Sequence, residues 1–232
     1  FLLGLLKEQQ RGLAFGVTLA ALACMSGISA SWLWTFASSD TAVVEIFTAG
    51  TEPPFAINLR IGLAEAALTL LINLTGLFSA LTLKDTLLAL GRRAMAVWLV
   101  AVMALSGIVL TRDLFNLFVF FELTVIATAG LVLLSEHAKN DGQALAAGFK
   151  YLVVSQFISV FLLIGIIFAY HATGTLNIDG MAAAVPLLSG DAAQAFALAF
   201  FLIFIAVVAE LKPFPANGWA LGSAEFLAEV AA

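Results

Sequence analysis

Two charged residues could carry chemistry because long apolar runs of sequence surround them. Glu122 lies near the middle of the run 114–134, and Lys212 comes directly after the run 192–211. A charge at the centre of a bilayer costs roughly 2.5–3.5 kcal/mol, so it persists where it is paired, hydrated or protonated. A carboxylate and an amine held in such states can exchange protons. The alternative for Glu122 is a buried ion pair that only locks helices together.

Lys212 stands at a predicted break in its helix. Pro213 and Pro215 follow it, and two prolines at this spacing cannot continue a regular helix. Unwound backbone at membrane depth is tolerated where protein buries it or a cavity wets it. We therefore predict a hydrated functional site at Lys212. The alternative is that the lysine marks the helix end and extends to the membrane interface.

Three further charged residues lie in or beside apolar runs. Lys150 is about two turns into its run, where a role in proton uptake and a simple extension to the cytoplasmic face are both open. Glu65 is predicted to face packed helices or the outer surface. Glu210 is two residues from Lys212, so on an intact helix the two side chains would point in different directions and need not pair.

Several classes of chemistry have no support in this sequence. The chain carries no CxxC, HExxH, GxSxG or phosphate-loop motif, and its two histidines, His137 and His171, lack metal-ligand spacing. The single cysteine, Cys24, permits no disulfide framework. No basic stripe suited to nucleic acid is present. We expect no cofactor, no metal site and no nucleic-acid partner.

The elements that position these residues are predicted to be membrane-spanning helices. The chain is 62% hydrophobic and 11% charged, whereas soluble domains carry about 25% charged residues. About 20 apolar residues cross a bilayer as a helix, and the runs are too continuous for the alternation of a membrane β-barrel. The predicted fold is an all-α, polytopic transmembrane helical bundle. Spans are predicted at about 13–34, 59–83, 94–110, 114–134, 144–170 and 192–211, after an apolar stub at 1–6.

The basic residues divide unequally between the two ends of the predicted bundle. Arg60 and Arg112 fall on one side when the loops are numbered alternately, and six basic residues fall on the other. Cytoplasmic loops carry the excess of Lys and Arg, so the side with six is predicted to be cytoplasmic. These six residues are Lys7, Arg11, Lys84, Arg92, Arg93 and Lys139.

Four motifs follow one another along the chain. They are PPFAI at 53–57, LTRDLFNLFVFFE at 110–122, AGFKYL at 147–152 with YHATGTL at 170–176, and ELKPFPANGW at 210–219. In this order they resemble a loop and the fifth, sixth and broken seventh helices of the antiporter-like membrane subunits. These subunits occur in respiratory complex I, Mrp-type cation/proton antiporters and membrane-bound hydrogenases.

The resemblance implies an antiporter-like fold of about fourteen helices containing two inverted repeats. Residues 1–232 would be a single transmembrane domain, a fragment from the end of helix one to the start of helix eight, with a broken seventh helix. The resemblance also implies that Glu122 and Lys212 form the acid–lysine pair of one half-channel, and that Lys150 matches a lysine near the cytoplasmic side. Asn217 departs from the pattern, because many relatives have histidine there, and residues 220–224 do not align well.

These implications predict translocation of protons, or of protons in exchange for sodium, through a Glu–Lys pair. The chain would be one subunit of a multisubunit complex in a bacterial or archaeal cytoplasmic membrane, with lipid and other membrane subunits as partners. The complex would be a redox-driven pump of the NADH:quinone oxidoreductase or hydrogenase kind, or a cation/proton antiporter. Two alternatives stay open: a structural membrane subunit without its own ion path, and an energy-coupling subunit of an inorganic-carbon uptake complex.

Overall fold

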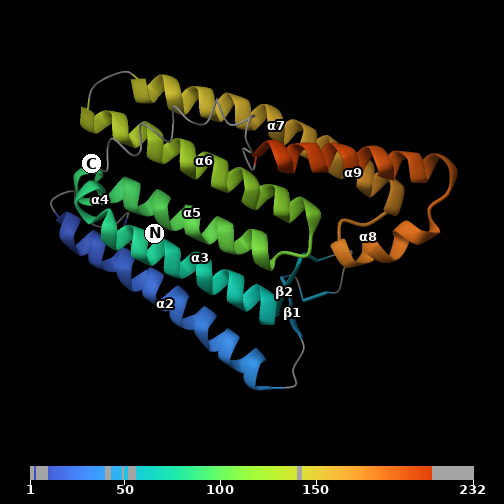
Figure 1. Ribbon diagram of the computed structural model, residues 1–232, viewed down its shortest axis with the longest axis horizontal. Coiled ribbons are helices and arrows are strands. Elements are labelled where there is room, and N and C mark those ends of the chain that lie inside the picture. Colours follow the sequence, from blue (N-terminus) through green and yellow to red (C-terminus); the bar gives the residue numbers. More distant parts are fainter. Residues whose placement is uncertain are drawn as a thin grey trace.

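Six helices in the described part of the computed structural model are long and apolar enough to cross a membrane. The model describes residues 3, 10–39, 43–48, 50, 51, 56–139 and 143–210. The helices lie side by side with their long axes roughly aligned (Figure 1), which confirms the predicted transmembrane bundle. They are α2 (Arg11–Ser38), α3 (Leu63–Thr82), α5 (Arg92–Leu110), α6 (Leu114–Lys139), α7 (Gln143–Thr173) and α9 (Gly190–Glu210).

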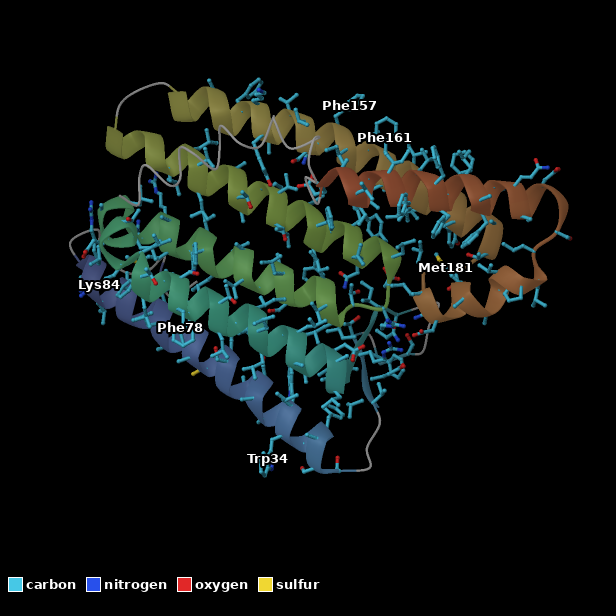
Figure 2. All side chains as sticks on the ribbon, viewed as in Figure 1. Trp34, Phe78, Lys84, Phe157, Phe161 and Met181 are labelled. Atoms are coloured by element: carbon cyan, nitrogen blue, oxygen red, sulfur yellow. The ribbon has the colours of Figure 1, made fainter. Side chains whose placement is uncertain are left out.

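The helices form a continuous packed series in which α7 lies between α6 and α9. Helix α2 packs on α3, α5 packs on α6, and α7 contacts both α6 and α9. Large apolar side chains such as Phe78 are exposed on the bundle, and Phe157 and Phe161 lie at its outer edge (Figure 2). An apolar exterior is what contact with lipid or with further membrane helices requires.

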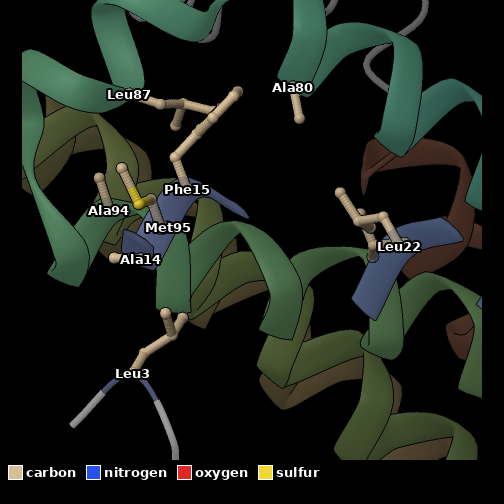
Figure 3. Close-up of a cluster of buried hydrophobic side chains, with 9 residues drawn as sticks. Leu3, Ala14, Phe15, Leu22, Ala80, Leu87, Ala94 and Met95 are labelled. Atoms are coloured by element: carbon tan, nitrogen blue, oxygen red, sulfur yellow. The ribbon is translucent and has the colours of Figure 1, made fainter. Parts of the chain in front are cut away.

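An apolar core lies between α2, α5 and the short helix α4 (Lys84–Leu90). Phe15 from α2 lies beside Leu87 from α4 and Met95 from α5, whereas Leu22 from α2 lies apart from them on the side of Ala80 from α3, and each of these side chains is buried (Figure 3). The first helical residue of α2 also ties α2 to α4 at this end of the bundle, because Arg11 Nη1 donates to the carbonyls of Leu88 and Ala89 at 3.2 and 3.1 Å.

A two-stranded antiparallel sheet lies at the opposite end of the bundle, where the sequence predicted none. Strands β1 (Val43–Phe47) and β2 (Asn58–Gly62) pair with Val44 opposite Ile61. The predicted start of the third span at 59 was therefore wrong, because β2 occupies 58–62 and α3 begins at Leu63. β-Branched residues favour strands, and the pairing lies beyond the helix ends (Figure 1), where water can satisfy a sheet edge.

The predicted loop between the last two spans contains short helices. Helix α8 (Ile178–Ala184) is followed by the 3-10 turn η2 (Val185–Leu187). Asn177 caps α8, since its side-chain oxygen accepts from the Gly180 backbone N–H at 2.8 Å. An Asn N-cap satisfies a helix donor that otherwise has no partner.

Candidate functional site

Glu122 lies on α6 and its two carboxylate oxygens have unequal surroundings. Gln156 Nε2 on α7 donates to Oε2 at 2.5 Å. Among the described residues, Oε1 is buried and has no hydrogen-bond partner. A buried polar atom without a partner is costly, so this oxygen requires a donor, a bound proton or water. The predicted role of Glu122 in proton exchange stays a prediction.

The preceding residue on α7 reaches a second carboxylate. Ser155 is fully buried, and its Oγ donates to Glu210 Oε1 at 3.4 Å. Consecutive residues of one helix point about 100° apart, so Ser155 and Gln156 face the helices on the two sides of α7. Glu122 and Glu210 therefore lie at the same level of α7, a relationship that was not predicted. The sequence feature that could have indicated it is the pair of adjacent polar residues, Ser155 and Gln156, inside an otherwise apolar span.

Apolar packing surrounds this level of the bundle. On one side Phe118 and Phe121 of α6 pack with Leu162 and Ile166 of α7 and Ala206 of α9. In a second group, Val125 and Ala129 of α6 pack with buried Tyr151 of α7. Glu122 itself is half-buried at this level, and Gln156 is exposed.

The remaining predicted site residues are placed as follows. Lys150 is on α7, six residues before Gln156, and its side chain is exposed. Lys212, together with Pro213, Pro215 and Asn217, lies outside the described residues. Helix α9 ends at Glu210, two residues before Lys212. The pairing of Glu122 with Lys212 and the broken helix both stay predictions.

Glu65 lies at the start of α3, where both of its carboxylate oxygens have partners. Its Oε1 contacts Arg60 Nη2 at 3.3 Å and its Oε2 accepts from the Gly62 backbone N–H at 3.1 Å. Both oxygens are thus occupied, and the carboxylate caps the start of α3.

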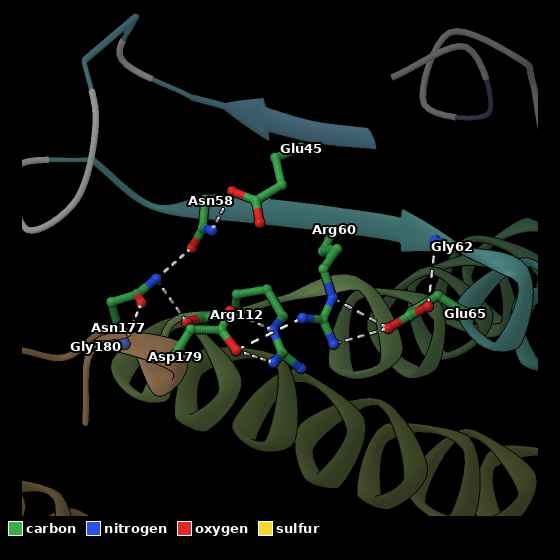
Figure 4. Close-up of polar contacts among 9 residues, drawn as sticks. All are labelled: Glu45, Asn58, Arg60, Gly62, Glu65, Arg112, Asn177, Asp179 and Gly180. Atoms are coloured by element: carbon green, nitrogen blue, oxygen red, sulfur yellow. Dashed lines mark hydrogen bonds and ion pairs between the residues drawn. The ribbon is translucent and has the colours of Figure 1, made fainter. Parts of the chain in front are cut away.

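The end of the bundle near the sheet is held by a polar cluster that joins residues far apart in the sequence (Figure 4). Asp179 of α8 contacts Arg112 Nη2 at 2.5 Å and Arg60 Nη1 at 3.5 Å. The hydrogen bond and charge of Arg112 hold the pKa of Asp179 below its usual value, with a smaller contribution from Arg60. Asn177 Nδ2 donates to Asn58 Oδ1 at 2.8 Å. The cluster thus contains Arg60 and Arg112, the two basic residues predicted to lie on the side opposite the cytoplasm.

The same end fixes the start of α6. Asp113 is buried and its Oδ1 accepts from the Asn116 backbone N–H at 2.7 Å, which caps the first turn. Glu122 follows nine residues later, roughly 13 Å along the helix axis. The described residues include no group of three or more His, Cys, Asp or Glu side chains placed to hold a metal ion.

Residues 111–225 match the family described as NADH:quinone oxidoreductase/Mrp antiporter, TM. The chain is 29% identical over 177 residues to the NADH-quinone oxidoreductase subunit N of Desulforudis audaxviator, covering 75% of this chain and 34% of that protein. It is 35% identical over 108 residues to a Na(+)/H(+) antiporter subunit of Alkalihalophilus pseudofirmus, covering 47% of this chain and 21% of that one. The chain therefore spans about a third or less of these relatives.

Solved structures share the same arrangement of helices. A chain of the archaeal membrane-bound sulfane sulfur reductase aligns with a TM-score of 0.76 at 28% identity, covering 90% of this chain and 42% of that one. A chain of the Mrp complex from Dietzia sp. gives 0.71 at 25% identity, covering 90% and 38%. A chain of Thermus thermophilus complex I gives 0.63 at 21% identity, covering 92% and 42%, which concerns the fold alone. These similarities confirm the integral membrane localisation and the predicted family resemblance.

Proposed function

Because the chain is an antiporter-like membrane subunit of the complex I and Mrp type, we propose that it moves protons across the membrane through Glu122 and Lys212. The observation that carries the proposal is the buried Oε1 of Glu122, which has no partner among the described residues. An ammonium group is the partner that would both complete the hydrogen bonding of this oxygen and balance its charge.

The proposed mechanism uses the strength of the Glu122–Lys212 pair. Gln156 holds Oε2 of Glu122 in place and leaves Oε1 for the lysine. While the pair is closed, the carboxylate stabilises protonated Lys212. When the pair opens, the ammonium loses this stabilisation and releases its proton, and a later closure favours uptake of another. The two groups titrate as a coupled system.

Proton uptake is assigned to the end of the bundle from which α7 begins. Lys150 is exposed near that end of α7, on the side where Arg11 and α4 lie. We assign this side to the cytoplasm from the distribution of basic residues. Lys150 would attract water and deliver protons toward Gln156 and Glu122.

The partners are proposed to be other membrane subunits that supply or use the energy. The relatives belong to an NADH-quinone oxidoreductase and to a Na(+)/H(+) antiporter, and the solved neighbours are parts of multisubunit membrane complexes. A redox module or an ion gradient would therefore drive ion movement, and the ion exchanged for protons could be sodium.

Replacement of Glu122 by Gln tests the proposal directly. The full subunit would be reconstituted with its partner subunits in liposomes carrying a pH-sensitive dye inside. A potassium diffusion potential would drive protons, so the natural energy source need not be known. We expect Glu122→Gln to lower proton flux by about tenfold or more, because losing an interaction of about 1.4 kcal/mol changes a population tenfold.

Glu65→Gln provides the matched control, since it removes a carboxylate whose two oxygens are already bound at the end of α3. This variant should assemble and keep normal flux. Assembly of both variants would be checked by size-exclusion chromatography. Normal flux in an assembled Glu122→Gln complex would show that this carboxylate has no part in translocation and would favour a structural role.

A further inference from the structure

Two consecutive arginines begin α5 at the end of the bundle opposite the sheet (Figure 1). Arg92 and Arg93 are the first two residues of the helix, and Gly91, with a φ of +83°, forms the turn between α4 and α5. Because α5 is long and apolar enough to cross a membrane, its first turn lies where the bilayer meets water. Arg92 is half-buried and has an interaction within the protein, whereas Arg93 is exposed. Arg93 therefore supplies the more accessible of the two charges.

Both arginines line a small cavity. Its volume is about 170 Å³, and Leu3 and Ala96 form its other walls. The described residues that line it include no acidic side chain. The first backbone N–H groups of α5 add a partial positive charge at this end of the helix. Guanidinium groups beside an apolar wall are suited to a phosphate that is attached to an apolar group.

The face of α5 that carries Arg93 continues into the membrane as an apolar surface. Ala96, Val100 and Met103 follow Arg93 at intervals of three, four and three residues, so all four lie on one side of the helix. Val100 is 37% exposed and Met103 is 46% exposed. From Arg93 to Met103 the helix rises by roughly 15 Å, which is half of the roughly 30 Å hydrocarbon core of a bilayer. The apolar surface therefore has the depth of one leaflet.

We propose that an anionic phospholipid binds here, with its phosphate at the two arginines and one acyl chain along the apolar surface that ends at Met103. A free phosphate ion would leave that surface unused, and the cationic headgroup of a zwitterionic lipid would oppose the arginines. The distribution of basic residues assigns this end to the cytoplasm, and anionic lipids give the cytoplasmic leaflet its negative surface potential. The inference does not depend on the translocation proposed above.

Lipid binding to the assembled complex tests this inference. The complex with the full subunit would be stripped of lipid in a neutral detergent and titrated with dioleoyl phosphatidylglycerol or dioleoyl phosphatidylcholine. Native mass spectrometry would count the lipids that stay bound. We expect wild type to retain phosphatidylglycerol at concentrations about tenfold lower than phosphatidylcholine, because two arginines attract the anionic headgroup. Arg93→Gln should weaken the binding of phosphatidylglycerol about fivefold, the effect of one basic residue at an anionic surface.

Lys84→Gln is the matched control, because Lys84 is an exposed basic residue at the same end of the bundle (Figure 2) and does not line the cavity. Its charge is screened by salt, so this variant should bind phosphatidylglycerol within about twofold of wild type. Arg93→Lys keeps the charge and should recover most of the affinity that Arg93→Gln loses. Equal weakening in Lys84→Gln and Arg93→Gln would mean that only the general charge of the surface attracts the lipid, which would overturn the site.

Changes in the lipid test the site without any substitution. Dihexanoyl phosphatidylglycerol, whose chains are too short to cover the surface as far as Met103, should bind wild type severalfold more weakly than the dioleoyl lipid. Release of the dioleoyl lipid by millimolar inorganic phosphate would show a simple phosphate site and overturn the proposal. Equal retention of phosphatidylglycerol and phosphatidylcholine would also overturn it, even if Arg93→Gln failed to assemble. Unchanged binding in an assembled Arg93→Gln complex would overturn it too, and would favour a neighbouring subunit as the group that covers the arginines.

Discussion

The contact between α7 and α9 depends on a glycine whose replacement has a calculable effect. A Cβ atom added at Gly165 would lie 3.0 Å from the Ala199 carbonyl oxygen, 3.1 Å from the Ile203 backbone nitrogen and 2.7 Å from Ile203 Cγ1. The Ile203 side chain can rotate, but the backbone atoms cannot. Gly165→Ala must therefore push α9 away from α7 by a few tenths of an ångström. Small residues permit such close contacts between membrane helices.

The cost can be separated from the intrinsic effect of replacing glycine. Overpacking costs about 1–3 kcal/mol, whereas replacing Gly by Ala in a helix contributes up to about 1 kcal/mol of stability. Gly16→Ala on α2 is the matched control, because a Cβ there meets nothing within 4 Å. Both variants share the helix contribution, so Gly165→Ala should be less stable than Gly16→Ala by about 1–3 kcal/mol.

Unfolding of the purified full subunit in mixed micelles, followed as denaturing detergent is added, would measure this difference. The reasoning is refuted if the two variants have the same unfolding free energy within about 0.5 kcal/mol, the usual range for surface substitutions. Such a result would mean that α7 and α9 are farther apart than the Gly165 contacts require. The geometry that brings Ser155 to Glu210 would then also be in doubt.

Two further predictions concern the polar cluster near the sheet. Asn177→Ala should destabilise the unfolding transition by about 1 kcal/mol, because it removes the α8 cap and the bond to Asn58; Asn177→Asp should keep the cap and lose less. Arg112 lowers the pKa of Asp179 in the folded protein below the ordinary value of 3.8. The ion pair therefore stabilises the fold at pH values above 3.8, and its contribution to the free energy of unfolding disappears as the pH falls through the lowered pKa. Asp179 is 47% exposed, so Asp179→Asn should cost up to about 1 kcal/mol at pH 7. An unfolding series from pH 7 to pH 3 should show this difference shrinking, and a difference that grows would contradict the assignment.

The spans were predictable because their signal is local and strong. An apolar run of about 20 residues has few structural options in a bilayer, and the six predicted runs agree with the six helices. The sheet was not predicted because pairing of 43–47 with 58–62 is a contact between separate segments. The alternation of apolar and polar residues in these short strands is a weaker signal than the apolar run that continues into α3. The helix was therefore predicted to begin too early in the sequence.

The site was only partly predictable from the sequence. Glu122 was identified by the cost of its charge, which depends on its own position. Glu210 was compared only with Lys212 on its own helix, and the spacing argued against a pair. Its contact with Ser155 depends on the rotation of α7 relative to α9, which neither helix alone determines. The pairing with Lys212 stays a prediction.

Two carboxylates in or beside the spans, Glu65 and Glu122, differ chiefly in how their oxygens are bound. Glu65 has an arginine on one oxygen and a backbone N–H on the other, so protonation would break two bonds and the group suits a fixed cap. Glu122 accepts from the Gln156 side-chain amide on one oxygen and, among the described residues, has no partner for the other, buried oxygen, so a proton or a cation would remove a cost. The position of a carboxylate within an apolar run does not by itself distinguish a fixed cap such as Glu65 from a candidate proton-exchanging group such as Glu122. Hydrogen-bond satisfaction does, because a group with an unsatisfied buried oxygen gains most from a partner that comes and goes.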